Sequence, residues 1–88
     1  MSGRVVTLRY FAWVREKVGR AEELVTLPVS VSTVAELMNW LPSRGPEYAR
    51  AFERASVIRA AIDRGHVKPS ASLEGAREIA FFPPVTGG

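Results

Sequence analysis

The segment from Thr33 to Pro42, with the sequence TVAELMNWLP, carries the strongest helix pattern in the chain. Its apolar side chains recur at positions i, i+3, i+4 and i+7, the spacing that lines one face of a helix: Val34, Leu37, Met38 and Leu41. Thr33 and Glu36 are spaced as in a capping box, which marks a helix start. Pro42 is expected to end the helix because proline cannot continue one. The sequence therefore predicts one main helix in the middle of the chain.

Short segments with the character of β-strands lie on both sides of this helix. Before it, Val5 to Phe11 and Glu23 to Leu27 alternate between the two faces of a half-buried strand. After it, Val57 to Asp63, the short pair His66-Val67 and Glu78 to Phe82 show strand character. This order predicts an α+β domain in which a mixed sheet of about four to five strands wraps around one main helix.

Two shorter helices complete the prediction. Ala12 to Val18 carries an apolar stripe and is followed by Gly19, a residue typical of a left-handed C-terminal cap. Glu47 to Arg54 follows a turn at Ser43 to Pro46. The remaining side chains expected in the core are Val6, Leu8, Tyr10, Val14, Val18, Leu24 or Val25, Leu27, Tyr48, Ala49 or Ala51, Phe52, Ile58, Ala60 and Ile62, with Trp13 and Trp40 packed against them.

Composition restricts the classes of function. A chain of 88 residues forms one domain with one modest core. It has no cysteine, which excludes disulfides and cysteine nucleophiles, and no apolar run long enough for a membrane helix. The net charge is +3, but the basic residues are scattered singly, so a solvated surface is favoured over a nucleic-acid footprint. We expect a cytoplasmic protein that binds neither membrane nor nucleic acid.

The end of the chain is its sharpest local feature. Pro83 and Pro84 have φ fixed near about −65° and cannot donate to a sheet ladder, so they predict a stiff, extended root after the last strand. Gly87 and Gly88 have no side chain and can enter a channel too narrow for a Cβ atom. The alternative is a frayed terminus without function. The sequence favours residues 1–82 as the folded domain and residues 83–88 as a tail that delivers its terminal carboxylate to another protein.

The chain resembles a known family, the small sulfur-carrier subunits of molybdopterin synthase. The most specific part of the resemblance is Ala80 to Gly88, with the sequence AFFPPVTGG. Supporting motifs are LRYFA at Leu8 to Ala12, VREKVG at Val14 to Gly19 and AID at Ala61 to Asp63. The resemblance covers nearly the whole chain and implies a ubiquitin-like β-grasp fold.

The same resemblance implies a chemistry centred on Gly88. In this family an ATP-dependent activating enzyme adenylates the terminal glycine, and the adenylate becomes a thiocarboxylate. The thiocarboxylate then donates its sulfur to cyclic pyranopterin monophosphate in the large subunit of a heterotetrameric synthase. The chain is therefore expected to be no enzyme on its own and to bind no cofactor or metal. Val85 and Thr86 complete the tail that would enter both partners.

The resemblance also implies a docking patch of Phe11, His66 and Phe82 for the large subunit. The alternative is that Phe11 caps the first helix and Phe82 packs under a loop. Tyr10 and Phe81 precede the two phenylalanines on the strands, so one ring of each pair is expected to face outward. His66 is the only histidine, and no acidic cluster near it in the sequence supports a role as catalytic base or metal ligand.

The chain departs from the family pattern in two places. Gly75 to Glu78 reads GARE where the family commonly has Asp-Gly-Asp-Glu, and Asp63 stands where asparagine is common. Three other functions remain open: a thiamine-pathway sulfur carrier, a ubiquitin-like modifier of lysine side chains, and a basic binding module whose tail is incidental.

Overall fold

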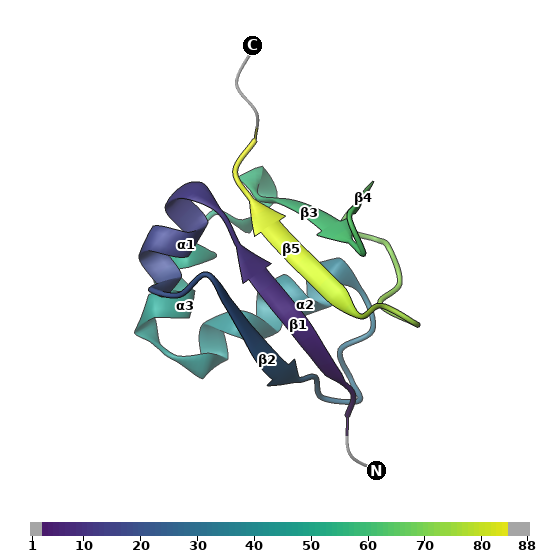
Figure 1. The fold of residues 1–88 in the computed structure, drawn as a ribbon. Helices are drawn as coiled ribbons and strands as arrows, with labels where there is room; N and C mark the ends of the chain where they lie inside the picture. Colours follow the sequence, from purple (N-terminus) through teal and green to yellow (C-terminus); the bar gives the residue numbers. More distant parts are fainter. Residues whose placement is uncertain (1–2, 85–88) are drawn as a thin grey trace.

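The computed structural model describes residues 3–84, and five strands within this range form one mixed sheet in the order β2-β1-β5-β3-β4 (Figure 1). The parallel pair is β1 with β5, and the other neighbouring strands are antiparallel. The strands are β1 (Val5–Tyr10), β2 (Glu22–Thr26), β3 (Arg59–Ile62), β4 (Gly65–Val67) and β5 (Glu78–Phe82). The predicted α+β class and strand number are confirmed.

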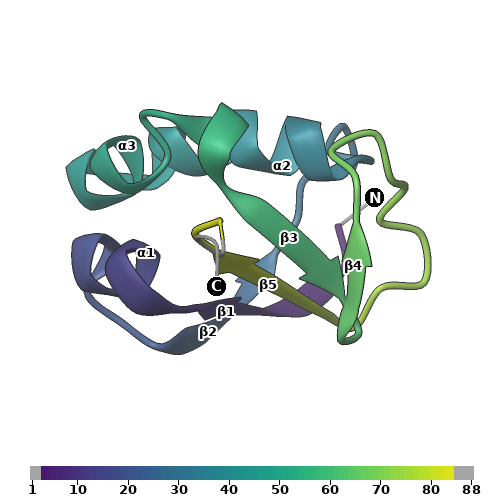
Figure 2. The ribbon, with the colours of Figure 1, turned by 90° about the horizontal axis from the view of Figure 1, so that it is seen from above.

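Helices cover one face of this sheet, and the view along the sheet shows α2 and α3 on the same side of it (Figure 2). The α-helices are α1 (Ala12–Val18), α2 (Val34–Trp40) and α3 (Pro46–Ala51), and the 3-10 helices are η1 (Leu41–Arg44) and η2 (Ala55–Val57). The opposite face of the sheet, which we call the outer face, carries the side chains that alternate with the core.

Local sequence chemistry explains where α2 begins and ends. The Glu36 amide donates to Thr33 Oγ1 at 3.1 Å, and the Thr33 amide donates to Glu36 Oε1 at 3.1 Å, which completes the predicted capping box. Val34 and Leu37 are fully buried against the sheet. Beyond Trp40 the chain tightens into η1, which has Pro42 in its first turn.

Several predicted boundaries are wrong, for identifiable reasons. The first strand ends at Tyr10 because Phe11 is the N-cap residue of α1. The turn predicted at Ser43 to Pro46 begins within η1 and ends at the first residue of α3. The helix predicted at Glu47 to Arg54 is α3, which starts one residue earlier, at Pro46, and ends at Ala51. Proline suits a first helical turn, where its missing N–H has no partner to lose.

The strand predicted from Val57 to Asp63 is also shorter. Val57 belongs to η2, and Asp63 has φ 47°, so the strand is confined to Arg59–Ile62. Asp63 and Arg64 both have positive φ, as a tight hairpin turn requires. The Asp63 carboxylate accepts hydrogen bonds from the amides of Arg77 and Glu78, at 3.1 and 2.9 Å. Asp63 therefore joins the hairpin turn after β3 to the start of β5.

The core contains most of the side chains predicted for it. Where the pattern left a choice, Val25 is buried and Leu24 is 73% exposed, and Ala51 is buried and Ala49 exposed. Ile62 was expected to be buried, yet it is only half-buried, because it lies at the end of β3 beside the hairpin turn. Trp13 and Trp40 pack against the core as expected.

A polar network joins the sheet to α3 and η1 at one edge of the core. The hydroxyls of Tyr10 and Tyr48 donate to Glu23 Oε2 at 2.8 and 2.6 Å. Arg44 and Arg20 each approach the same carboxylate to 3.2 Å. Burial acts to raise the pKa of Glu23, but the hydrogen bonds from the two tyrosines and then the two arginine charges outweigh it. The pKa of Glu23 is therefore lowered.

The network makes stability depend on pH in a defined direction. Because the pKa of Glu23 is lower in the folded state than its ordinary value of 4.5, its contribution is complete above pH 4.5 and is lost as pH falls below it. Replacement of Glu23 by Gln is expected to lower the free energy of unfolding by about 2 kcal/mol at pH 7, since charged hydrogen bonds are lost. Urea unfolding at pH 7 and pH 3 measures both values.

The difference between wild type and Glu23→Gln should shrink at pH 3, because below pH 4.5 the unfolded chain binds a proton at Glu23 more readily than the folded protein, whose Glu23 pKa is lowered. Glu16→Gln is the matched control, because Glu16 is exposed and forms no ion pair within residues 3–84. A difference that stays constant from pH 7 to pH 3 would show that the charge of Glu23 contributes nothing.

Candidate functional site

The candidate site begins where β5 ends. Phe82 is the last strand residue, and Pro83 and Pro84 follow it half-buried and outside regular secondary structure. Neither proline has an amide hydrogen with which to extend the ladder. The other tail residues of the prediction, Val85, Thr86, Gly87 and Gly88, lie outside the described residues, so their roles stay predictions.

Each of two adjacent aromatic pairs, Tyr10 with Phe11 and Phe81 with Phe82, has one ring in the core and one outside it, as the sequence predicted. Tyr10 and Phe81 are buried and are register partners on the parallel strands β1 and β5. Phe11 directly follows β1 and Phe82 is the last residue of β5, and the Phe11 amide donates to the Phe81 carbonyl at 3.0 Å. The Phe11 side chain is 40% exposed and Phe82 is half-buried.

His66 completes an aromatic patch, defined as Phe11, His66 and Phe82. The rings of His66 and Phe82 lie 5.1 Å apart between centroids, which explains why Phe82 is partly covered. On the other side, the Arg9 guanidinium lies 5.2 Å from the centre of the Phe11 ring. The structure thus brings the three predicted patch residues to the end of the sheet from which the tail departs.

Two alanines that sequence reasoning missed form a floor beside this patch. Ala80 and Ala61 are register partners on β5 and β3, and they are 9% and 6% exposed although they alternate with core residues. Ala80 also pairs with Arg9, and Ala61 pairs with His66. Larger neighbours therefore surround a shallow, small-residue surface. The sequence signal that could have revealed this surface is an alanine, rather than a polar residue, at an outward-facing position of β3 and of β5.

Charged residues continue the outer face away from the aromatic patch. Arg9 lies between two carboxylates, 3.9 Å from Glu22 and 3.8 Å from Glu78. Exposed pairs of this length contribute little to stability, about 0–1 kcal/mol. Their effect is to fix the position of Arg9 beside Phe11, so that the patch has a defined cationic border.

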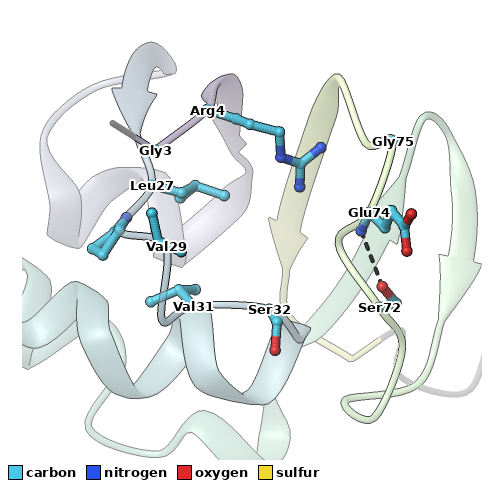
Figure 3. A pocket seen from close by; sticks show the side chains of 10 residues that line it. Gly3, Arg4, Leu27, Val29, Val31, Ser32, Ser72, Glu74 and Gly75 are labelled. Carbon is cyan, nitrogen blue, oxygen red and sulfur yellow. Dashed lines mark hydrogen bonds between the residues drawn. The ribbon is translucent and has the colours of Figure 1, made fainter. Parts of the chain in front are cut away.

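Another pocket of the described residues lies near the start of β1 (Figure 3). It has a volume of about 630 Å³ and is lined by the start of the chain and two loops: Gly3, Arg4, Leu27, Pro28, Val29, Val31, Ser32, Ser72, Glu74 and Gly75. Arg4 donates to the Leu73 carbonyl, and the Glu74 amide donates to Ser72 Oγ at 3.0 Å. Its position near the start of β1 separates it from the end of β5 (Figure 1).

Other kinds of site have no support within residues 3–84. This range holds no group of three or more His, Cys, Asp or Glu side chains that could bind a metal ion. None of its helices is long and apolar enough to cross a membrane. The candidate site is therefore the sheet end at Phe82, with its aromatic patch and the tail that follows it.

Comparison with known proteins gives three findings. The model of the ThiS family matches residues 8–88. The molybdopterin synthase sulfur carrier subunits of Haemophilus influenzae and Escherichia coli are 30% and 32% identical over 84 residues, which is 96% of this chain and 100% of theirs. The structure of SAMP1 from Haloferax volcanii is similar with a TM-score of 0.70 and 21% identity, over 97% of this chain and 100% of that one.

Proposed function

This chain belongs to the ThiS family and has its ubiquitin-like β-grasp fold, and from these facts we propose that it is the sulfur-carrying subunit of a molybdopterin synthase. The observation that carries the proposal is the similarity to two molybdopterin synthase sulfur carrier subunits across 96% of the chain. The Gly87-Gly88 end and the Pro83-Pro84 root support it, because they suit delivery of a terminal carboxylate. We place the protein in the cytoplasm.

The proposed chemistry uses Gly88 as the reacting residue. A carboxylate is a poor electrophile, so an oxygen of Gly88 first attacks the α-phosphorus of ATP and pyrophosphate leaves. Hydrosulfide, or a donor equivalent to it, then attacks the carbonyl carbon, the bond to AMP breaks, and a proton is released. The product is a thiocarboxylate, a sulfur nucleophile that needs no cysteine, which agrees with the absence of cysteine from the sequence.

The catalytic groups of both steps are proposed to belong to partners. The activating enzyme binds and uses ATP, and the large synthase subunit holds the pterin precursor. Two thiocarboxylates in succession would supply the two sulfurs of the dithiolene. The chain itself holds the tail and offers the aromatic patch beside it, which is why we propose that Phe11, His66 and Phe82 contact the large subunit.

Reconstitution tests the function. The full chain, an activating enzyme with ATP, a sulfide source and the large subunit are incubated with cyclic pyranopterin monophosphate, and molybdopterin is measured. Product that requires this chain supports the proposal. A chain that accepts sulfur but leaves the pterin unconverted would be a carrier for another pathway, such as thiamine synthesis.

The aromatic patch gives a prediction about affinity. Phe82→Ala and Phe11→Ala are each expected to weaken binding of the large subunit by about 2 kcal/mol, roughly 30-fold, because aromatic anchors dominate protein interfaces. Isothermal titration calorimetry measures the change. Val29→Ala is the matched control, since Val29 is 69% exposed and lies at the opposite end of the sheet. Equal effects of all three substitutions would remove the patch from the interface.

The second candidate function is a ubiquitin-like modifier of lysine side chains. Its support is the fold shared with SAMP1, the small archaeal modifier protein 1 of Haloferax volcanii. In that case the adenylated glycine would pass to a lysine amine, which displaces AMP and forms an isopeptide bond. Conjugates of higher mass in a cell lysate, absent when Gly88 is deleted, would identify this activity.

A further inference from the structure

A second pocket, of about 400 Å³, lies on the helical side of the same sheet end. It is lined by residues of α1, of α3 and the turn after it, and of η2: Trp13, Lys17, Arg50, Ala51, Glu53, Arg54 and Val57. Trp13 follows the patch residue Phe11 by two positions, and Val57 precedes Arg59, the register partner of Phe82, by two. Two of the lining elements, α1 and η2, thus join within two residues to Phe11 and to the partner of Phe82, so the pocket lies at the same end of the sheet as the root of the tail.

The pocket is electropositive. Lys17, Arg50 and Arg54 are exposed cations, and Glu53 is the one carboxylate among the described residues that line it. None of the three cations forms an ion pair within residues 3–84, in contrast to Arg9, Arg20 and Arg44.

An aromatic wall holds one of these charges in place. The Lys17 ammonium lies 5.4 Å from the centre of the Trp13 ring, a cation–π distance. Trp13 is itself half-buried and packed against the core, so this wall is part of the folded domain. The pocket thus has a fixed apolar side and three donors without acidic partners in the described part of the chain.

We propose that this pocket receives a carboxylate-bearing segment of the enzyme that adenylates Gly88. The inference rests on the proposed function. Acidic side chains complement the three cations, and the cations lie at the sheet end from which Pro83 departs, so one protein can contact both the pocket and this root. Attraction between solvated charges accelerates encounter and is readily reversed, and a carrier that must leave after loading needs both properties.

The choice of the activating enzyme over the large subunit follows from the chemistry of the two surfaces. The aromatic patch buries apolar area, which suits a lasting association between subunits. The charged pocket suits the activating enzyme, which must bind the chain and then release it. Nucleic acid is the less suitable occupant, because Glu53 interrupts the cations and a single pocket is not the basic stripe that follows a phosphate backbone.

Steady-state kinetics of adenylation tests the proposal. The full chain is titrated into its activating enzyme with ATP and labelled pyrophosphate, and the exchange rate is measured at several salt concentrations. The double variant Arg50→Glu/Arg54→Glu, and separately Lys17→Glu, are expected to raise KM for the chain by about tenfold or more with kcat unchanged. The salt dependence of kcat/KM should become shallower, because fewer charges attract the enzyme.

Control variants distinguish a failure of this proposal from a failure of the proposed sulfur-carrier function. Arg77→Glu reverses an exposed charge just before β5, at the other end of that strand, and should leave KM unchanged. Affinity for the large subunit should stay within about twofold in the pocket variants, while Phe82→Ala changes it. Thermal melts establish that each variant is folded.

Three outcomes would overturn the proposal. The first is an unchanged KM in folded pocket variants while deletion of Gly88 abolishes exchange, which leaves the proposed function intact. The second is loss of large-subunit affinity in the pocket variants, which assigns the pocket to that partner. The third is salt-sensitive binding of single-stranded RNA that the variants lose while adenylation is unaffected. Absence of exchange with the wild-type chain would instead contradict the proposed function itself.

Discussion

Deletion of Gly88 is expected to abolish thiocarboxylate formation and, with it, synthesis of molybdopterin. The deletion moves the terminal carboxylate back by one residue, roughly 3.5 Å along an extended chain. A misplacement of about 1 Å at a reacting group can reduce a rate 100-fold, so the loss is expected to exceed about 100-fold. Pyrophosphate exchange and the reconstituted pterin assay measure the two steps separately.

The deletion is expected to leave the domain intact, because the described core ends at Phe81 and does not involve residue 88. Thr86→Ser is the matched control, since it changes the tail without changing its length, and it should retain most of the activity. Circular dichroism and a thermal melt establish that the deletion variant is folded. Normal molybdopterin synthesis by a folded chain that lacks Gly88 would contradict the proposed role of the terminus.

Substitution of Phe81 by Ala is expected to have the largest effect on stability. Phe81 is fully buried, stacks on Tyr10 with ring centroids 6.3 Å apart, and packs in a T-shaped arrangement with Phe52, with ring centroids 5.1 Å apart. Removal of a buried phenylalanine ring costs about 3–5 kcal/mol through lost transfer energy and the cavity left behind. A domain of this size has a total stability of about 5–15 kcal/mol, so the variant should be marginal.

Urea unfolding measures this effect, and the neighbouring residue provides its control. Phe82→Ala removes the same ring from a half-buried position on the outer face and should cost about 1 kcal/mol or less. Phe81→Leu keeps much of the buried volume and should lose about 1–2 kcal/mol, so the comparison survives if Phe81→Ala does not fold. Equal losses at positions 81 and 82 would contradict the assignment of one ring to the core and the other to the surface.

The elements that the sequence predicted best have a strong local cause. The start of α2 follows from the capping box at Thr33 and Glu36, and β5 follows from an apolar run that two prolines end. Alternation on β1 placed Tyr10 in the core and Phe11 outside it. These features depend on a few residues that are close in the sequence, so the sequence alone is enough to predict them.

The elements that the sequence mispredicted depend on tertiary contacts. Phe11 could extend the strand by its character, but its backbone instead caps α1 while its amide bonds to Phe81. The floor of Ala61 and Ala80 needs the register of three strands, and the pocket of Trp13, Arg50 and Val57 needs two helices and a 3-10 turn to meet. No spacing within the chain expresses these contacts.

The proposed function requires that the terminal carboxylate of Gly88 accepts sulfur, and intact mass spectrometry tests this most directly. The full chain is incubated with an activating enzyme, ATP and a sulfide source, and its mass is measured before and after. The account predicts a gain equal to one exchange of oxygen for sulfur, located in the C-terminal fragment and absent when ATP is omitted. An unchanged mass after incubation with an enzyme that loads a related carrier would contradict it.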